Sequence, residues 1–337
     1  MRKQSKRSRS RSRIEASSVL KATALIVLTL VVLVLCFLAI KHGRGDASAA
    51  EATSRVTSAP SAPSAPSAPS ASANTGQSEL EESGGGDSPA EAFSPVTQLI
   101  VATGEDSAYR AIAGSCPEGG SSIAVTEDGG ATWASFDVGA RLGIGAIQSV
   151  RPGNTGYASF VGQNMADCSS ASAGQTYTSG NDWEVAAGVL EVSWYIDPTD
   201  SQMIMGPDSA PVEAPCALRQ LTSNGNDSVA GLCTDGRVVS SSDAGASWTE
   251  SEPIEGIDAL AFAGDRVLTT VLGNPACAEG VAIRSLVSSL AVTGELCAPD
   301  LAAAAGQTSI SESPDGTLWL LADENVRRSS DDGASWR

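Results

Sequence analysis

The sequence predicts an all-β domain over residues 95–337, preceded by one transmembrane helix and a linker. In this domain short apolar runs recur between turn residues about every dozen residues, which is typical of strands. No stretch of it has the long 3.6-residue apolar periodicity of a helix. An eight-residue phrase also recurs, as "TEDGGATW" at 126–133, "SSDAGASW" at 241–248 and "SSDDGASW" at 329–336.

The transmembrane helix is predicted at residues 22–40, "ATALIVLTLVVLVLCFLAI", which carry no charge. A helix of this length spans about 28 Å, close to the thickness of a hydrocarbon core. The alternative is a signal peptide cleaved after "ASA" at 47–49, but the apolar core of a signal peptide is usually about 7–15 residues long. Leu35 stands where a lipid-modified Cys36 would need a small residue. We therefore expect an uncleaved signal anchor.

The orientation of this anchor follows from the basic residues beside it. Residues 1–21 form a basic tail with eight Lys and Arg, whereas only Lys41 and Arg44 follow the span closely. We expect the tail in the cytoplasm and the rest of this single-pass chain outside the cell membrane. The "RSRSRSR" run at 7–13 also resembles a nucleic-acid arm, but its place beside a membrane span favours contact with anionic lipids.

The chain beyond residue 44 is acidic. It holds 11 Arg, no Lys and 38 Asp and Glu, so its net charge is 11 − 38 = −27. Such a surface repels nucleic acids, which excludes them as partners. The acids are scattered, which favours a role in solubility over a cation site, and no metal or cofactor is predicted.

Residues 41–94 are predicted to be a disordered linker rich in Ser, Ala and Pro, with "SAPSAPSAPSAPS" at 58–70. Proline removes backbone donors, and too few apolar residues are present to form a core. Fully extended, the linker reaches on the order of 150 Å. It can therefore hold the β domain away from the membrane.

Six of the seven cysteines follow the predicted span, and this even number predicts disulfides. Six cysteines allow 15 pairings. Zinc is the alternative, but no two cysteines have CxxC spacing and no His follows residue 42. The nearest-neighbour pairing is Cys116 with Cys168, Cys216 with Cys233, and Cys277 with Cys297.

Each position of the recurring phrase suits a tight turn between two strands. The first (Ser or Thr) and third (Asp) residues can accept bonds from nearby backbone N–H groups. The fifth, Gly, permits a positive φ, and the eighth, Trp, begins the next strand and buries its ring between sheets. A degenerate copy, "TYTSGNDW" at 176–183, has Thr178 in place of Asp. The structural residues of the four copies are Thr126, Asp128, Gly130, Trp133, Thr176, Gly180, Trp183, Ser241, Asp243, Gly245, Trp248, Ser329, Asp331, Gly333 and Trp336.

This pattern, Ser/Thr-x-Asp-x-Gly-x-x-Trp, resembles the Asp-box, or bacterial neuraminidase repeat (BNR). The domain is thus similar to the Asp-box β-propellers, a superfamily that includes sialidases, sortilin-like receptors and photosystem assembly factors. The resemblance implies a β-propeller in which each motif joins the third and fourth strands of a blade. It also implies that the motif residues are structural, away from the ligand-binding end of the central channel.

The motif starts lie at 126, 176, 241 and 329, and blades run about 40–50 residues. This spacing implies about six four-stranded blades, with five or seven as alternatives. In the wide last gap, residues 257–273 and 281–297 suit a blade that has lost its motif. Only Arg337 follows the last Trp, so we expect a strand from 93–103 to complete the last blade and close the ring. The alternative is that the sequence is a fragment.

Catalytic motifs of sialidases are not found. Their Phe/Tyr-Arg-Ile/Leu-Pro motif is matched only by "YRAI" at 109–112, without the proline, and more poorly by "VRPG" at 150–153. A tyrosine nucleophile would have to be Tyr109, Tyr157, Tyr177 or Tyr195, none of which has a neighbouring signature. The domain has no His, which excludes a Ser-His-Asp mechanism. Other glycosidases need only two carboxylates, which the sequence cannot place.

We therefore assign no catalytic residue and expect a cell-surface module that binds a protein, peptide or glycan without transforming it. The alternatives are a sialidase-like or other glycoside hydrolase and a purely structural envelope part. Three arginines converging at the channel mouth beside a Tyr–Glu pair would favour the hydrolase. The candidates for such a cluster are Arg110, Arg141, Arg151, Arg219, Arg237, Arg266 and Arg284.

Overall fold

The computed structural model describes residues 96–154 and 156–337. The predicted tail at 1–21, transmembrane helix at 22–40 and linker at 41–94 all lie outside the described residues. Within the described part of the chain, no helix is both long and apolar enough to cross a membrane.

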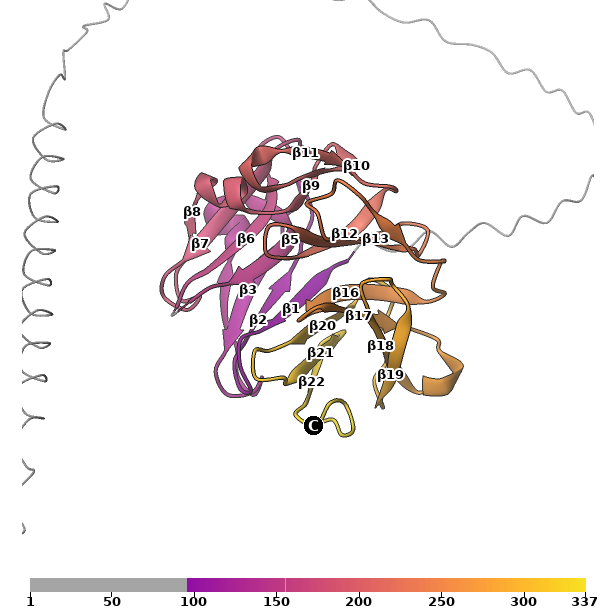
Figure 1. Ribbon diagram of the computed structural model, residues 1–337. Helices are drawn as coiled ribbons and strands as arrows, with labels where there is room; N and C mark the ends of the chain where they lie inside the picture. The colour runs from indigo at the N-terminus through magenta and orange to yellow at the C-terminus, as the bar shows by residue number, and fades with distance from the viewer. Residues whose placement is uncertain (1–95, 155) are drawn as a thin grey trace, which may run out of the picture. The chain divides into compact units, whose positions relative to one another are not determined.

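Six antiparallel sheets follow one another around a central axis and form the blades of a β-propeller (Figure 1). Blade 1 contains β1 (Gln98–Ala102), β2 (Ala108–Ile112), β3 (Ser122–Thr126) and β4 (Ala134–Asp137). Blade 2 contains β5 (Ile144–Pro152), β6 (Ala158–Asn164), β7 (Ala171–Thr176) and β8 (Glu184–Val185). Blade 3 contains β9 (Tyr195–Asp197), β10 (Asp200–Met205) and β11 (Pro211–Glu213).

Blade 4 contains β12 (Leu218–Asn224), β13 (Ser228–Cys233), β14 (Val238–Ser241) and β15 (Thr249–Glu250). Blade 5 contains β16 (Ile257–Ala263), β17 (Arg266–Val271), β18 (Gly280–Leu286) and β19 (Val292–Pro299). Blade 6 contains β20 (Thr308–Glu312), β21 (Leu318–Ala322) and β22 (Asn325–Ser329). The all-β class and the count of six blades are thus confirmed, and blade 5 is a blade without the motif.

Helical structure within the described residues is limited to four short segments: α2 (Val138–Leu142), η1 (Ala187–Val192), η2 (Pro207–Ser209) and η3 (Pro275–Cys277). Helix α2 is capped at its start by Asp137, whose side chain accepts a bond from the N–H of Ala140. It ends at Gly143, whose φ of +68° suits a glycine.

The two ends of the propeller carry different loops, because each blade is an antiparallel meander. We call "loop face" the end with the loops between second and third strands and the connections between blades. We call "turn face" the end with the hairpins between first and second strands and the motif turns. The motif copies at 126–133, 176–183 and 241–248 join the third and fourth strands of blades 1, 2 and 4.

Blade 3 is short, and its strands run in the opposite direction to those of the other blades, a feature that no sequence pattern predicts. Its β9–β10 turn lines the same cavity as Gly114 and Thr234, which follow the second strands of blades 1 and 4 at the loop face. Its start is at the turn face, where Nε1 of Trp194 donates to the carbonyl of Asn226 in the β12–β13 hairpin (3.0 Å). The chain reaches that point through η1 instead of a first strand.

Six of the seven apolar clusters of the core form a ring, one between each pair of neighbouring blades, and the seventh lies in blade 5. A motif tryptophan packs in four of these junctions: Trp133 between blades 6 and 1, Trp183 between blades 1 and 2, Trp248 between blades 3 and 4, and Trp336 between blades 5 and 6. The other two junctions precede blades 3 and 5, which lack the motif. Tryptophan carries the largest apolar area of any side chain, so it suits the space between diverging sheets.

The expected closure of the last blade by a strand from 93–103 is wrong. β1 instead pairs with β2 as the innermost strand of blade 1, in a register from Gln98 opposite Ile112 to Ala102 opposite Ala108. Blade 6 contacts β1 through side chains: the N–H groups of Ile100 and Ala102 donate to Ser309 and Ser311 (3.0 Å each). The blades are also not all four-stranded, since blades 3 and 6 have three described strands.

Candidate functional site

The motif turns share one hydrogen-bond pattern. In the turn at 126–133, the hydroxyl of Thr126 accepts from the N–H of Gly130 (2.9 Å) and donates to Oδ1 of Asp128 (2.8 Å). The turns at 241–248 and 329–336 repeat both bonds. The first and third residues therefore close the turn.

The residue at the seventh position of the motif, which is not among the predicted structural residues, completes this pattern. Asp128 accepts from the N–H (2.9 Å) and the hydroxyl (2.6 Å) of Thr132. Ser247 and Ser335 make the same two bonds in their turns. The available signal was that all three full copies carry a hydroxyl residue at this position.

These bonds stabilise the ionised carboxylate. They hold the pKa of Asp128, Asp243 and Asp331 at about 2, and the largest contribution comes from the hydroxyl at the seventh position. In the degenerate turn the hydroxyl of Thr178 takes the place of the carboxylate and accepts from the N–H of Asp182 (2.9 Å). That turn therefore keeps its shape without a carboxylate at the third position.

The motif glycines are required by both conformation and space. Gly130, Gly180, Gly245 and Gly333 have φ between +81° and +87°. A Cβ on Gly245 would lie 2.5 Å from Cγ1 of Val212, and one on Gly333 would lie 2.5 Å from Cδ1 of Leu296. Each contacted residue belongs to the preceding blade, so the turn is also part of a blade junction. The motif residues are thus explained by folding, and a ligand site has to be sought elsewhere.

A cavity of about 580 Å³ opens at the loop face, and we call it the loop-face cavity. It lies over blades 1 to 4, where the short, inverted blade 3 leaves room. Its apolar floor includes Leu99, Ile147, Leu218 and Leu221. Its polar lining is Gln148, Gln163, Asp197, Thr199, Ser201, Arg219, Gln220 and Thr234.

Two of these glutamines are occupied in holding neighbouring blades together. The side-chain amide of Gln148 donates to the carbonyl of Ile196 (3.0 Å) and accepts from its N–H (2.8 Å). Gln220 holds Leu260 of blade 5 in the same way (3.1 and 2.9 Å). Each amide thereby satisfies backbone groups on the channel edge of an inner strand, which would otherwise be left unpaired. Gln163, Ser201 and Thr234 have no such role and are the polar groups open to a ligand.

The cavity also presents charges of both signs. Asp197 accepts from the hydroxyl (2.6 Å) and N–H (2.8 Å) of Thr199, and these bonds lower the pKa of Asp197 and keep it ionised. Arg219 donates from Nη2 to the carbonyl of Ile257 (2.8 Å). Burial lowers the pKa of this guanidinium, while the nearby Asp258 opposes the shift.

A second cavity, of about 390 Å³, occupies the turn-face end of the channel, and we call it the turn-face cavity. It shares Leu99, Gln148, Gln220 and Leu221 with the loop-face cavity, so these residues separate the two ends of one channel. Its carboxylate, Glu312, is paired with Arg266 (2.5 Å). The remaining polar lining is mostly hydroxyl groups: Ser149, Thr222, Ser223, Ser309 and Ser311.

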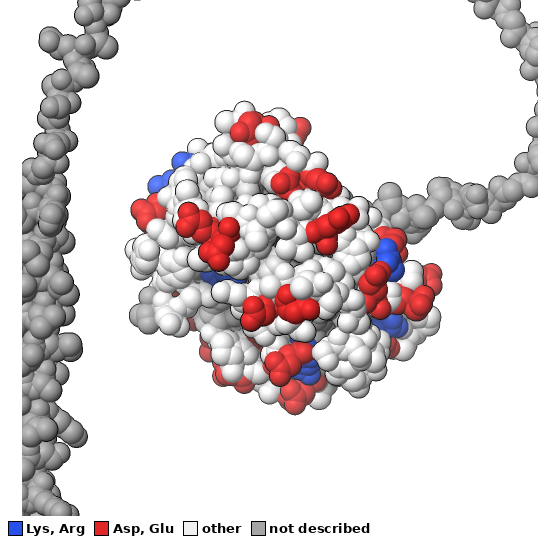
Figure 2. All heavy atoms as spheres, turned by 45° about the horizontal axis from the view of Figure 1, so that its top comes forward, with Lys and Arg blue, Asp and Glu red and all other residues white. Residues whose placement is uncertain are grey.

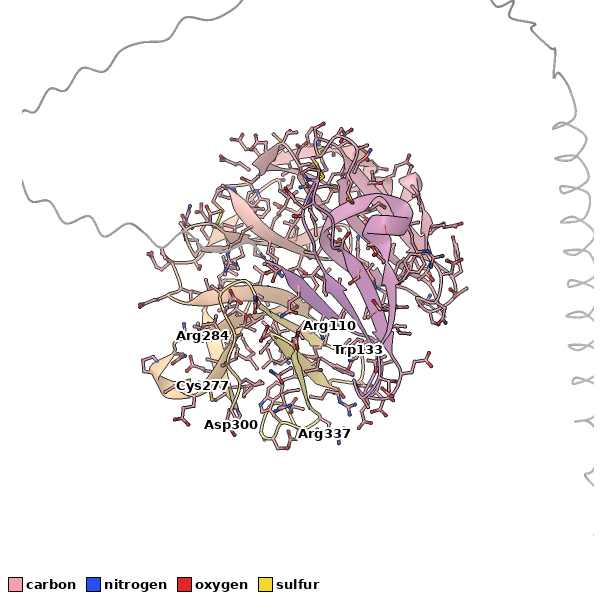
Figure 3. All side chains as sticks on the ribbon, turned by 180° about the vertical axis from the view of Figure 1, so that it is seen from behind. Arg110, Trp133, Cys277, Arg284, Asp300 and Arg337 are labelled. Carbon is pink, nitrogen blue, oxygen red and sulfur yellow. A yellow bond between two sulfur atoms is a disulfide. The ribbon has the colours of Figure 1, made fainter. Side chains whose placement is uncertain are left out.

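The seven candidate arginines do not gather in one cavity. Arg219 lines the loop-face cavity and Arg151 the turn-face cavity. Figure 3 shows Arg110 and Arg284 on different blades, and Arg284 pairs there with Glu295 (2.7 Å). The others make contacts within or between blades: Arg110 with Gln98, Arg141 with Asp182, Arg237 with Asp235 and Glu250, and Arg266 with Glu312.

The other groups of a sialidase centre are equally separated. Among the described residues that line the two cavities there is no tyrosine, and each cavity has a single carboxylate, Asp197 or Glu312. Tyr109 and Tyr195 are buried in the core, and Tyr157 and Tyr177 pack on each other with ring centroids 5.3 Å apart. The described residues also contain no cluster of three metal-ligating side chains.

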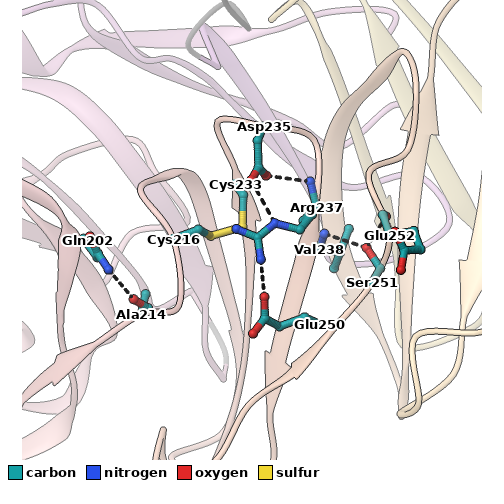
Figure 4. Close-up of a disulfide and its surroundings, with 10 residues drawn as sticks. All are labelled: Gln202, Ala214, Cys216, Cys233, Asp235, Arg237, Val238, Glu250, Ser251 and Glu252. Carbon is teal, nitrogen blue, oxygen red and sulfur yellow. Dashed lines mark hydrogen bonds and ion pairs between the residues drawn. A yellow bond between two sulfur atoms is a disulfide. The ribbon is translucent and has the colours of Figure 1, made fainter. Parts of the chain in front are cut away.

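Three disulfides, Cys116–Cys168, Cys216–Cys233 and Cys277–Cys297, are formed, which is the nearest-neighbour pairing. All three lie at the loop face, in loops after second strands or near the connections between blades. Cys116–Cys168 joins blades 1 and 2. Cys216–Cys233 joins the segment before β12 to the end of β13 in blade 4, and Cys277–Cys297 joins η3 to β19 in blade 5. Figure 4 shows Cys216–Cys233 beside Arg237, which contacts both Asp235 and Glu250. Two of the disulfides, Cys116–Cys168 and Cys216–Cys233, thus brace loops of blades whose residues line the cavity, whereas Cys277–Cys297 lies on blade 5.

Acidic side chains dominate the surface around these features. Figure 2 shows them spread over several blades, with few basic side chains between them. Fold, channel and bracing together define a six-bladed β-propeller whose loop face is the candidate binding end.

Comparisons with known proteins show no family for this chain. No family model matches this chain, and no curated protein matches it. Among solved structures it is similar to the SapL1 lectin in complex with alpha methyl fucoside (13% identity, TM-score 0.44, 74% of this chain and 97% of that one). It is also similar to AofleA from Arthrobotrys oligospora (8%, 0.46, 73% and 86%) and to YCF48 bound to D1 peptide (16%, 0.28, 73% and 68%). At these identities and TM-scores, the likenesses carry no argument about fold or function.

Proposed function

We propose that this protein is a membrane-anchored, extracytoplasmic binding module that holds a protein, peptide or glycan ligand in the loop-face cavity without transforming it. The observation that carries the proposal is the cavity itself. It combines an apolar floor and a few unengaged polar groups, and two disulfides brace loops of the blades that line it, which suits a preformed ligand site. Preformed sites bind more tightly because less conformational entropy is lost when the ligand binds.

The location is proposed from the sequence. The apolar segment 22–40 would anchor the chain, the basic tail would stay in the cytoplasm, and the Ser/Ala/Pro linker would extend the propeller from the cell surface. Three disulfides are consistent with an oxidising compartment. Protease added to intact cells should then remove the propeller and leave the tail protected. Protection of the propeller would contradict this topology.

The family assignment to Asp-box (BNR) propellers is also part of the proposal. It is supported by the three full motif copies and by their shared turn geometry. A glycoside hydrolase is the less supported function. Hydrolysis of a glycosidic bond generally requires two carboxylates across the substrate, and each of the two channel cavities has one.

The test compares two substitutions that each block one end of the channel. Ser201→Trp would fill the loop-face cavity, and Ser223→Trp would fill the turn-face cavity. The full-length protein and both variants would be screened on the same glycan and peptide arrays. We expect ligands of the native protein to be lost with Ser201→Trp and kept with Ser223→Trp. Retention by Ser201→Trp, or loss only with Ser223→Trp, would refute the assignment of the site.

A further inference from the structure

The outer strand of blade 5 differs from those of the other four-stranded blades. β19 is eight residues long, whereas β4 has four and β8 and β15 have two each. It lies at the end of its sheet, so one of its edges has no neighbouring strand among the described residues. Six of its eight residues are exposed, including Val292 with 52% of its surface accessible.

Natural sheets generally protect their edges by keeping edge strands short or by placing charges, prolines or bulges there. β8 and β15 are protected by their shortness. β19 has a register shift at its start, between Ser285 and Leu286 on its partner strand, and Pro299 at its end. The stretch between them, 293–298, contains one charged residue, Glu295, which is already paired with Arg284. Its outer N–H and C=O groups are therefore open.

This edge is also held rigidly. The disulfide Cys277–Cys297 ties β19 to η3, and the hydroxyl of Thr293 donates to the carbonyl of Ser285 (3.3 Å). On its inner side Leu296 packs under the motif turn of blade 6, at Gly333. Figure 3 places Cys277, Arg284 and Asp300 together on this blade. A rigid, extended edge needs no ordering before another strand pairs with it.

We propose that the free edge of β19 binds an extended, positively charged segment of another protein by strand addition. Main-chain hydrogen bonds to the outer groups of 293–298 supply the affinity in this mode of recognition. Charge favours a basic partner: residues 96–337 hold 10 Arg, no Lys and 31 Asp and Glu, a net charge of 10 − 31 = −21, and Glu279 and Asp300 flank β18 and β19. The same charge opposes the approach of a second copy of this chain.

The probe is a fluorescent synthetic nonapeptide of alternating lysine and valine, added to the full-length protein. Binding would be followed by anisotropy and by hydrogen exchange of the amides of β19. Thr293→Lys places a like charge on the free edge, and Thr249→Lys places the same charge on the two-residue β15 as a matched control. A peptide with a central proline, which cannot complete the ladder, tests for main-chain pairing.

We expect slower exchange at 293–298 with the peptide, and affinity about tenfold weaker for Thr293→Lys, equivalent to about 1.4 kcal/mol. Thr249→Lys should bind as the native protein does, and the proline peptide should bind less well. Equal binding by both variants, or no change of exchange in β19, would overturn the proposal. Slow exchange of 293–298 without peptide, together with a dimer in sedimentation, would overturn it in favour of self-association. The outcome is independent of the loop-face cavity, since Ser201→Trp should leave peptide binding intact.

Discussion

At the scale of single residues, the motif aspartates show how an exposed side chain can have a structural role. Asp243 faces water, yet both of its oxygens accept bonds from Ser247 and one accepts from the hydroxyl of Ser241. A carboxylate has more acceptor capacity than any neutral side chain of its size, so it can join both ends of the turn at once. The lowered pKa is the electrostatic consequence of those bonds.

This predicts a defined loss of stability in acid. An unfolded Asp has a pKa near 3.9, whereas Asp128, Asp243 and Asp331 have a pKa of about 2 in the fold. A depressed folded pKa contributes stability above the unfolded pKa, and this contribution is lost as the pH falls towards the folded value. The unfolding midpoint should therefore fall as the pH is lowered from about 4 to about 2.

The variant Asp243→Asn isolates one of these groups. Its melting temperature should be below that of the native protein at neutral pH, and the difference should shrink as the pH approaches the folded pKa of about 2. Asp265→Asn, at an exposed hairpin residue without a hydrogen bond, is the control. A difference that does not depend on pH would show that the charge of Asp243 is not involved.

At the scale of elements, a motif turn both reverses the chain and contacts the preceding blade. Gly245 shows the two requirements together, because it has a φ of +81° and Val212 lies where its Cβ would be. The sequence alone reveals the first requirement, since glycine in a turn is a local signal. It cannot reveal the lack of space for a Cβ, because Val212 belongs to blade 3, which has no motif.

A pair of glycine substitutions separates these requirements. Gly225→Ala meets only the backbone penalty, because Gly225 has a φ of +77° and no atom within 4 Å of the new Cβ. It should destabilise the fold by about 1–2 kcal/mol. Gly245→Ala adds overpacking against Val212, a further cost of roughly 1–3 kcal/mol. Urea unfolding of the two variants should show this order, and equal losses would mean that the turn does not press on blade 3.

The disulfides are the second element-scale feature. Cys116–Cys168 spans 52 residues, and the others span 17 and 20. A closed loop of 52 residues should restrict the unfolded chain by about 4 kcal/mol. The double substitution of Cys116 and Cys168 by Ser should thus lower stability by about that amount and speed hydrogen exchange in loops 113–121 and 165–170. Unchanged exchange in both loops would show that the bridge does not brace the loop face.

At the scale of the whole molecule, the ring is closed by contacts between blades 6 and 1, and not by a shared strand. Arg328 reaches from β22 to the β1–β2 hairpin, where it donates to the carbonyl of Glu105 (2.5 Å) and to the carboxylate of Asp106 (2.6 Å). Its guanidinium carbon lies 5.1 Å from the ring centroid of Trp319. At the channel, Ser309 and Ser311 bond the edge of β1.

Loss of the contacts between Arg328 and the β1–β2 hairpin should destabilise the ring at the junction of blades 6 and 1 only. Arg328→Ala removes charged hydrogen bonds to blade 1 and should cost roughly 2 kcal/mol. Hydrogen exchange should become faster in β1 and β20, on the two sides of the junction. Arg284→Ala, which breaks a pair within blade 5, should affect that blade only. Equally faster hydrogen exchange in all blades after Arg328→Ala would show that these contacts do not act locally.

The sequence predicted the strands and the blade type because both depend on local signals. The motif copies and the alternation of strands and turns are both read within about ten residues. Blade 3 could not be predicted because it has no motif and three short strands. The loop-face cavity could not be predicted for the same reason, since the shortness of blade 3 leaves the room for it. The closure of the ring could not be predicted because Arg328 and Ser309 bond to residues more than two hundred positions away in the sequence.

The central claim is that the motif tryptophans lie between successive blades, and Trp183 tests it most directly. Its ring centroid is 6.2 Å from that of Tyr109 in blade 1 and 5.3 Å from that of Phe160 in its own blade. In nuclear Overhauser spectra of the full-length protein, we expect cross-peaks from the Trp183 indole to both rings. Cross-peaks to Phe160 without any to Tyr109 would place the indole outside the junction and contradict the account.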